Sequence, residues 1–256
     1  MKIAVCVKHV PDGRLRLDPD TKRIDRGGDG ALNRVDVNAI EEALKIKDST
    51  DVEVVLVSLG PQNAVESLLA GLALGADRAV LVSDPAAVGS DLLATSELLS
   101  AVLKNEAPDL VLFGQQSVDG SGGLLWAAVA ERLALPEISQ AASLAISGST
   151  VVVTRQSEAG NEVIEAPMPV VVGVSDSINE PRYSSLRGKM GAKKKPLQVV
   201  GLADLGIGPD EVGEQGSRTT VLAITPPRPR GSTTRVEEQA GAAQAILDFL
   251  AERDLA

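Results

Sequence analysis

Short apolar runs alternate with amphipathic stretches over the first 135 residues, and this alternation restricts the possible folds more than any other feature of the chain. Four runs rich in Val and Leu are typical of strands that are buried on both faces of a parallel sheet. They are KIAVCVK (2–8), VEVVLVSLG (52–60), RAVLVSD (78–84) and DLVLFG (109–114). Each is followed, directly or after a loop, by a stretch with helical spacing of apolar residues. Four such alternations predict an α/β fold with a parallel sheet covered by helices on both faces.

The pattern changes after Pro136. Between about residues 137 and 176, two clusters of Gly, Ser and Asn separate short β-rich runs, which predicts an insert of antiparallel strands joined by hairpins. A loop-rich region (201–232) then leads to an amphipathic helix, which we expect from about Val236 to Arg253. The predicted organisation is a Rossmann-like domain over 1–198 and an extended tail with a helix over 199–256. A tail of this kind often lies across another subunit.

Residues 179–195, NEPRYSSLRGKMGAKKK, form a basic arm on an acidic chain. The arm has six Lys or Arg residues and one acid, Glu180, whereas the whole chain has 25 Lys and Arg against 35 Asp and Glu. Pro181, Gly188 and Gly191 interrupt it, so we expect neither a strand nor a helix there.

Composition excludes several functional classes. A net charge of −10 argues against general affinity for nucleic acid or for anionic membrane surfaces. No window approaches 18 uncharged apolar residues, so no membrane insertion is expected, and the short apolar start MKIAVCVKHV does not fit a signal peptide. Cys6 is the only cysteine, which leaves no disulfide framework and no cysteine-based zinc site. We expect a cytoplasmic protein.

The loop after the fourth apolar run is the strongest candidate for ligand binding. Its sequence, GQQSVDGSGG (114–123), has four glycines and two serines just before a predicted helix. Ligands of parallel α/β sheets bind beyond the carboxyl ends of the strands. A Gly-rich turn at a helix N-terminus offers backbone N–H groups and the positive end of the helix dipole to a phosphate. The alternative is a tight strand-to-helix turn without a ligand.

The side chains suited to catalysis are few. His9 is the only histidine, and at a strand end it is expected to be an exposed loop residue or a polar neighbour with its hydrogen bonds satisfied. Cys6 lies within a strand, where burial would raise its pKa and make it inert. Acidic residues are scattered through the first loop, where they are expected to be solvated rather than to bind a cation: Asp12, Asp18, Asp20, Asp25 and Asp29. The sequence therefore predicts no catalytic residue.

Three segments together resemble the β subunit of electron transfer flavoproteins: VCVKHVPD at the first strand, GQQSVDGSGG after the fourth, and the NEPRY…LRGKM…AKKK pattern of the basic arm. NAIEEALKIKD, SLGPQ and LALGADRAVLVSD add to the match, which runs in order over nearly the whole chain. The resemblance implies an adenine-nucleotide-binding α/β domain and a heterodimer with an α subunit. The pair would share one FAD and carry electrons, and the β subunit would not be an enzyme on its own.

The resemblance also implies a site for a structural AMP in the β subunit. Carried over to this chain, that cofactor-binding set lies in the first strand, at the start of the first helix, at the end of the second strand and in the Gly-rich loop. Its members are Cys6, Asn33, Arg34, Val35, Asp36, Leu59, Gly114, Gln115, Gln116, Ser117, Val118, Asp119, Gly120, Ser121, Gly122 and Gly123. The phosphate loop inferred from the residues alone falls on the same place.

The basic arm matches the family's recognition segment for partner dehydrogenases, and the anchoring leucine corresponds to Leu186. The implied partner-binding residues are Arg182, Tyr183, Leu186, Arg187, Lys189 and Met190. An apolar anchor fills a pocket, while Arg182, Arg187 and Lys189 would steer the encounter. The implied partners are acyl-CoA or other flavin dehydrogenases as donors and an acceptor such as a quinone oxidoreductase. The C-terminal helix is expected to pack on the α subunit.

The sequence departs from the family pattern at two places in the nucleotide site. Arg34 and Val35 stand where many members have Pro and an aromatic residue. Residues 121–124, Ser-Gly-Gly-Leu, replace side chains that are often acidic, Asn, Gln or Thr, so we expect backbone N–H groups rather than side chains to hold a phosphate.

A second branch of the family is electron-bifurcating and places another FAD where AMP would bind. The segments LDPDTKRI, GSDLLATS and LRGKM resemble that branch, whereas NEPRY resembles the AMP branch, which we favour.

Two other classes share a nucleotide-binding α/β core. An adenylating ligase would carry a pyrophosphate loop of the SGGxDS type after the first strand, and KHVPDGR is not one. A nucleotide-sensing module of the universal stress type is generally much shorter and lacks the hairpin insert, the arm and the tail.

Overall fold

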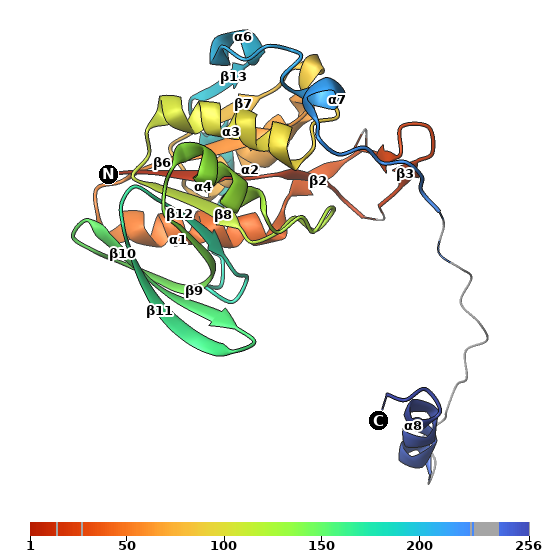
Figure 1. Cartoon of the computed structure of the whole chain (residues 1–256). Coiled ribbons are helices and arrows are strands. Elements are labelled where there is room, and N and C mark those ends of the chain that lie inside the picture. Colours follow the sequence, from red (N-terminus) through yellow and green to blue (C-terminus); the bar gives the residue numbers. More distant parts are fainter. Residues whose placement is uncertain (14, 27, 226, 228–240, 256) are drawn as a thin grey trace. The chain divides into compact units, whose positions relative to one another are not determined.

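The computed structural model describes the chain except residues 14, 27, 226, 228–240 and 256. The chain divides into two units, Met1–Val221 and Leu222–Ala256, each described by itself below. The first unit contains a nine-stranded sheet, in the order β11-β10-β9-β12-β8-β1-β6-β7-β13 (Figure 1). Its strands are β1 (Lys2–Cys6), β6 (Glu53–Leu59), β7 (Arg78–Val82), β8 (Leu110–Gly114), β9 (Glu137–Ser147), β10 (Thr150–Ser157), β11 (Gly160–Pro167), β12 (Val170–Val174) and β13 (Leu197–Val200).

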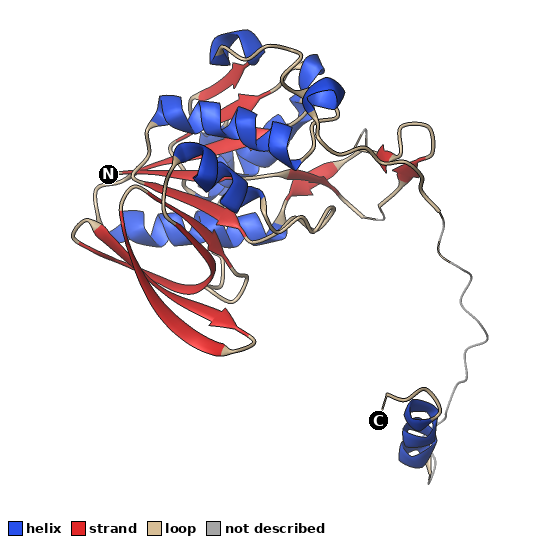
Figure 2. Ribbon diagram, viewed as in Figure 1, coloured by secondary structure: helices blue, strands red, loops and turns tan. Residues whose placement is uncertain are grey.

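Helices cover both faces of the central parallel strands (Figure 2). α1 (Arg34–Ser49) and α2 (Val65–Leu74) contribute to the core on one face, and α3 (Leu92–Glu106) and α4 (Leu125–Leu133) contribute to the core on the other. Successive side chains of a strand point to opposite faces, so Ile3 and Val5 join the first core and Ala4 and Cys6 join the second. The predicted α/β fold and the four predicted parallel strands are confirmed.

The hairpin insert is only partly as predicted. β9, β10 and β11 pair antiparallel, as expected from the turn clusters. β12 differs: it returns to the central sheet and pairs parallel with both β8 and β9. All five of its residues are buried, so this continuous Val-rich run is a parallel-type strand rather than the last arm of a hairpin.

The short elements of the first unit lie largely in its connecting segments. They are β2 (His9–Pro11) with β5 (Gly30–Leu32), β3 (Leu17–Asp18) with β4 (Arg23–Ile24), the 3₁₀ turns η1 (Gln62–Ala64) and η2 (Pro85–Ala87), and the helices α5 (Leu186–Ala192), α6 (Leu202–Leu205) and α7 (Gly213–Gly216). After the basic arm the chain adds β13 parallel to β7, an edge strand that was not predicted from the sequence.

The basic arm contains the helix α5, so the prediction that the arm is irregular was wrong for residues 186–192, whereas residues 179–185 form neither helix nor strand. Ser185 caps α5, because its Oγ accepts a hydrogen bond from the Gly188 backbone N–H at 3.0 Å. Gly188 lets α5 approach α2: a Cβ at this position would lie 2.3 Å from the carbonyl oxygen of Ala73. Tertiary contact therefore stabilises a helix that two glycines would otherwise disfavour.

The second unit contains α8 (Ala242–Ala251). The predicted helix began at about Val236, but residues 236–240 lie outside the described part of the chain. Ile246, Leu247 and Phe249 are each about half exposed, so α8 presents apolar surface that the described residues of this unit do not cover. In the described part of the chain, no helix combines the length and the apolar character needed to cross a membrane.

Candidate functional site

The candidate nucleotide site lies at the carboxyl ends of β1, β6 and β8. Because these neighbouring strands are parallel, their ends bring together Cys6, Leu59 and Gly114 at one edge of the sheet. α1 begins beside them, after Asn33. The loop of residues 115–124 follows β8 and ends at the start of α4. The structure thus places the predicted phosphate loop next to the predicted start of the first helix.

Asn33 joins α1 to this loop. Its fully buried side chain donates from Nδ2 to the carbonyl oxygen of Gln116 and accepts at Oδ1 from the backbone N–H of Val118, both at 3.0 Å. A side chain with one donor and one acceptor is needed to satisfy both backbone groups. Asn33 therefore fixes the first half of the loop relative to the N-terminal turn of α1.

Asp36 lies in the first turn of α1 and is buried. It accepts a hydrogen bond from the backbone N–H of Lys8 at 2.7 Å. Burial raises the pKa of its carboxyl to about 7, against hydrogen bonds that favour the charged form. Gly114 is required here, since a Cβ would lie 2.4 Å from Asp36 Oδ1. Burial likewise raises the pKa of the Cys6 thiol, which is consistent with an inert thiol.

Asp119 holds the second half of the loop. Its side chain has no exposed surface, and it accepts bonds from Lys8 Nζ at 2.7 Å and from the Arg26 guanidinium at 2.6 Å. Burial alone would raise the pKa of Asp119, but bonds from Lys8, Ser117 and Arg26 outweigh it and hold the pKa at about 2. The sequence analysis did not single out Lys8 and Arg26. A signal for Lys8 was present, because it is the lysine that ends the first buried apolar run, KIAVCVK (2–8).

The tip of the loop is open. Ser121 and Gly123 have φ angles of 46° and 58°, a conformation that glycine adopts most readily. A Cβ added at Gly122 would meet nothing within 4 Å. Gly120 and Gly122 are exposed, and so is Arg34 at the start of α1. Space and backbone groups are therefore available beside the cations Lys8 and Arg26.

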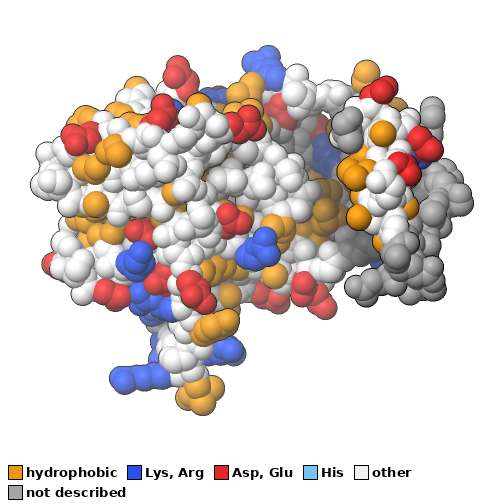
Figure 3. Space-filling view, turned by 90° about the horizontal axis from the view of Figure 1, so that it is seen from below, with side chains coloured by type: hydrophobic (Ala, Val, Ile, Leu, Met, Phe, Trp, Pro, Cys, Tyr) orange, Lys and Arg blue, Asp and Glu red, His pale blue; other side chains and the backbone are white. Residues whose placement is uncertain are grey.

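The basic arm forms a second candidate site. Tyr183, Leu186 and Met190 are 95%, 77% and 69% exposed. Leu186 and Met190 stand one helical turn apart on α5, so both lie on the same side of the helix. Arg187 and Lys189 are exposed beside them. Figure 3 shows a face of the molecule with a projection on which Lys or Arg side chains lie beside exposed hydrophobic ones, the combination expected of a docking surface.

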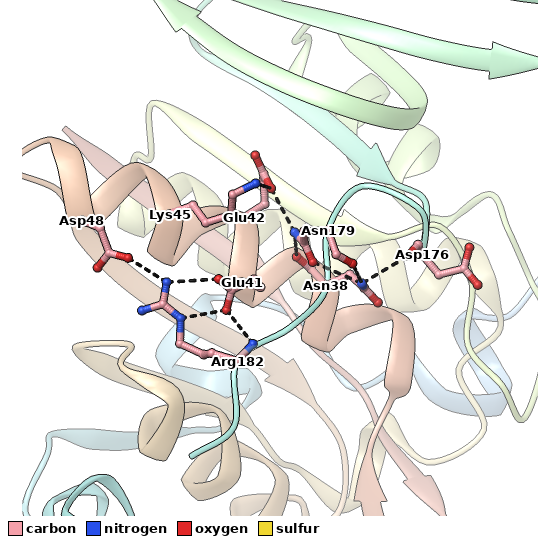
Figure 4. A network of polar contacts seen from close by, with 8 residues as sticks. All are labelled: Asn38, Glu41, Glu42, Lys45, Asp48, Asp176, Asn179 and Arg182. Atoms are coloured by element: carbon pink, nitrogen blue, oxygen red, sulfur yellow. Dashed lines mark hydrogen bonds and ion pairs between the residues drawn. The ribbon is translucent and has the colours of Figure 1, made fainter. Parts of the chain in front are cut away.

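Arg182 does not belong to this exposed set. Its guanidinium binds the carboxylate of Glu41 through Nε at 2.8 Å and through a terminal nitrogen at 3.1 Å, and it also contacts Asp48 at 2.7 Å (Figure 4). These bonds raise the pKa of Arg182, chiefly through Glu41. The side chain is therefore held against α1, whereas Arg187 and Lys189 project freely into solvent.

His9 is buried, which differs from the exposed loop residue considered for it. Its Nδ1 lies 2.8 Å from Ser67 Oγ, and its Nε2 has no hydrogen-bond partner among the described residues. A Cβ on Gly30 would lie 2.1 Å from Nε2, so β5 packs directly over the ring. In the first loop, Asp18 accepts backbone N–H bonds from Asp20 and Thr21. No group of three or more metal-ligating side chains is found among the described residues.

Comparisons with known proteins identify the family of the chain. Residues 21–205 match the family model described as the electron transfer flavoprotein domain. The chain is 35% identical to the electron transfer flavoprotein subunit beta of Mycobacterium tuberculosis (strain ATCC 25618 / H37Rv), over 97% of each chain. It is 37% identical to the protein of the same name from Megasphaera elsdenii, over 99% of this chain and 97% of the relative. Identity to the caffeyl-CoA reductase-Etf complex subunit CarD of Acetobacterium woodii is 38%, over 94% and 95% of the two chains.

Proposed function

Because the chain belongs to the electron transfer flavoprotein family as a β subunit, we propose that it works as an electron carrier in a heterodimer with an α subunit. In this proposal it binds a structural AMP at the carboxyl edge of its sheet and completes an FAD site with the α subunit. The basic arm docks flavin dehydrogenases such as acyl-CoA dehydrogenases, and the electrons pass on to an acceptor such as a quinone oxidoreductase. Its own side chains perform no bond-making chemistry.

The loop of residues 115–124 carries the proposal for the nucleotide. Asn33 and Asp119 fix this loop from both sides, so its backbone groups are organised before a ligand arrives. Three features of the loop would attract a phosphate: the backbone N–H groups of a Gly-rich turn, the positive end of the helix dipole at the N-terminus of α4, and the positive charges of Lys8 and Arg26. Gly122 leaves room for an anion, since no atom would lie within 4 Å of an added Cβ.

The departures at residues 121–124 are compatible with this proposal. Short or absent side chains remove side-chain ligands but expose the backbone, and the backbone N–H group is the element that a phosphate needs. AMP is a ligand of fixed charge and shape that carries no electrons. It would fill the cleft and tie α1 to the loop, whereas FAD, when bound, supplies the electron-accepting isoalloxazine ring.

A second FAD in the place of AMP is the alternative. The relative in Acetobacterium woodii is named as part of a caffeyl-CoA reductase-Etf complex, and it is as similar to this chain as the β subunits are. The segment LDPDTKRI forms β3 and β4, and Arg26 follows them to reach Asp119. Arg26 adds a second cation near the loop, which a diphosphate would use better than a single phosphate. This observation favours the alternative.

The exposed surface of the basic arm supports the docking role. Leu186 and Met190 offer apolar side chains that can enter a pocket of the partner, and Arg187 and Lys189 offer charges that accelerate the encounter with an acidic surface. A small apolar contact with a charged rim suits a carrier that must dissociate after each transfer.

The test uses the purified heterodimer and an acyl-CoA dehydrogenase reduced with its acyl-CoA. We expect Leu186→Ala to raise the KM for the dehydrogenase at least about tenfold, because a central apolar anchor contributes on the order of 2 kcal/mol. The FAD content of the heterodimer should stay the same. Val163→Ala is a control, since it also removes an exposed apolar side chain but lies on β11, outside the arm and outside the nucleotide loop. Equal effects of the two variants, or loss of FAD from Leu186→Ala, would refute the docking role.

A further inference from the structure

The outer face of α1 is polar and nevertheless buried. Ile40 and Leu44 pack into the core beneath the helix, whereas Asn38, Glu41 and Glu42 lie on the other side and are at most 7% exposed. The polar residues follow a spacing of three and four, which places them along one stripe of the helix. Buried carboxylates and amides need partners, so the segment that covers this stripe is fixed by the bonds it makes.

Asn179 pairs with Asn38 at the start of the basic arm. Asn38 Nδ2 donates to the Asn179 carbonyl oxygen at 3.0 Å, and Asn179 Nδ2 donates back to the Asn38 carbonyl oxygen at 3.0 Å (Figure 4). Asn179 Nδ2 also donates to Glu42 Oε2 at 2.9 Å. This reciprocal exchange fixes the backbone position of the arm's first residue on α1.

Glu41 holds the next part of the arm. Its buried side chain accepts three hydrogen bonds from Arg182: from the backbone N–H at 3.1 Å, from Nε at 2.8 Å and from a terminal nitrogen at 3.1 Å. A carboxylate facing a guanidinium fork at two points fixes orientation as well as distance. Tyr183 follows directly and is 95% exposed, so the last fixed residue stands next to the first exposed one.

The far end of the arm is fixed on α2. Lys195 Nζ donates to the carbonyl oxygens of Leu72 at 2.9 Å and Ala76 at 2.5 Å, and burial lowers the pKa of Lys195. Between the two ends, Gly188 lies against the Ala73 carbonyl. The arm is thus held at its start, its middle and its end, and the side chains left exposed include Tyr183, Leu186 and Met190.

We propose that Glu41 and Arg182 are positioning residues for the basic arm: they hold its root on α1, so that the exposed apolar side chains are presented to a partner in one orientation. This inference rests on the proposed docking function and assigns a role to α1 in it. Side chains that are ordered before binding lose less freedom on association, so a fixed arm binds more tightly than a loose one with the same contacts. Arg182 therefore acts from behind the surface, in contrast to the steering role expected for it from the sequence.

The experiment compares Glu41→Gln with the wild-type heterodimer in two measurements. The first is hydrogen exchange of the amides in residues 183–192. Gln keeps the size of the side chain but removes the charge, and we expect exchange there to become about tenfold faster, because bonds to charged groups are the stronger ones. The second is the rate of electron transfer from a reduced acyl-CoA dehydrogenase to the heterodimer, measured at several dehydrogenase concentrations. The KM should rise about tenfold and kcat should stay close to wild type, since positioning affects docking.

Three further variants complete the comparison, two as controls and one as a second test of the same contact. Asp48→Asn removes the exposed partner of the same arginine and should have a smaller effect than Glu41→Gln. Glu162→Gln breaks a comparable exposed pair with Arg155 on the β10–β11 hairpin and should change neither measurement. Arg182→Lys keeps the charge but loses the fork, so it should resemble Glu41→Gln.

The outcomes separate this inference from the docking function. Unchanged exchange of residues 183–192 in both Glu41→Gln and Arg182→Lys would overturn the inference, whatever the transfer rates are. Faster exchange with an unchanged KM would also overturn it, because the bonds would then only stabilise the fold. If Leu186→Ala has no effect on transfer, the docking function itself has failed.

Discussion

Gly188 and Gly191 provide the sharpest test of how the basic arm is held. Both are helical residues of α5, but their surroundings differ. A Cβ at Gly188 would lie 2.3 Å from the backbone oxygen of Ala73, whereas a Cβ at Gly191 would meet nothing within 4 Å. The same substitution should therefore change stability in opposite directions at two positions three residues apart.

The magnitudes follow from two competing terms. Replacing Gly by Ala inside a helix stabilises it by about 0.8–1 kcal/mol, because the unfolded chain loses freedom. Gly191→Ala should gain only part of this stabilisation, since Gly191 lies in the last turn of α5. In Gly188→Ala the clash is with backbone, which cannot rotate away, and forced overpacking typically costs ~1–3 kcal/mol. We expect Gly188→Ala to lower the local stability of α5 by ~1–2 kcal/mol and Gly191→Ala to raise it slightly.

Native-state hydrogen exchange of the α5 amides measures these local free energies directly. The assay uses the heterodimer, with the amides of α3 as an internal reference that neither substitution touches. A Gly188→Ala variant that is as protected as wild type would refute the close contact between α5 and α2. Two substitutions with shifts of the same sign would refute the reasoning as a whole.

Three further predictions concern the nucleotide site. Replacing both Gly122 and Gly123 with Val should lower the bound nucleotide by more than half, because the side chains would fill the open tip and Gly123 has a positive φ. Chromatography of the released nucleotide measures this, and full retention would count against the loop as the phosphate site. Asp36 has a pKa raised from 3.8 to about 7, so its contribution to stability is present below about pH 4 and is lost as pH rises to about 7. The free energy of unfolding of the wild type should therefore fall relative to that of Asp36→Asn over this range. Parallel curves of unfolding free energy against pH would contradict the burial of the charge. The pKa of Asp119 is shifted in the opposite direction, from 3.8 to about 2, so its stabilisation is present above about pH 4 and is lost as pH falls to about 2. Asp119→Asn should make the free energy of unfolding less dependent on pH in this acid range. An unchanged dependence would argue against the ion pairs with Lys8 and Arg26.

The central sheet could be predicted from the sequence because each of its first four strands is a continuous apolar run between polar loops. The place of the loop of residues 115–124 followed from topology, since parallel strands place their carboxyl ends at one edge. Its grouping with Asn33 and Asp36 was implied by the resemblance to the family. The direction of β12 could not be predicted in this way. Pairing direction depends on where the chain returns, and a Val-rich run fits a hairpin and a parallel strand equally well.

The basic arm shows a second limit of the sequence. Its glycines and its proline indicate a loop, and they outweigh the helical spacing of Leu186 and Met190 in any local reading. Contacts with residues more than a hundred positions away, Glu41 and Ala73, make the helix stable and bury the polar stripe of α1. The number of charges in the arm was visible, but which of them are exposed and which are bound could be decided only in three dimensions.

The most direct test of the proposed carrier is the nucleotide content of the heterodimer. The chain is co-expressed with its α subunit, the complex is denatured, and the released nucleotides are separated and quantified by chromatography. The account predicts about one FAD and one AMP for each heterodimer. Two FAD and no AMP would contradict the AMP site and establish the alternative, and a well-formed complex without flavin would contradict the electron-carrier function itself.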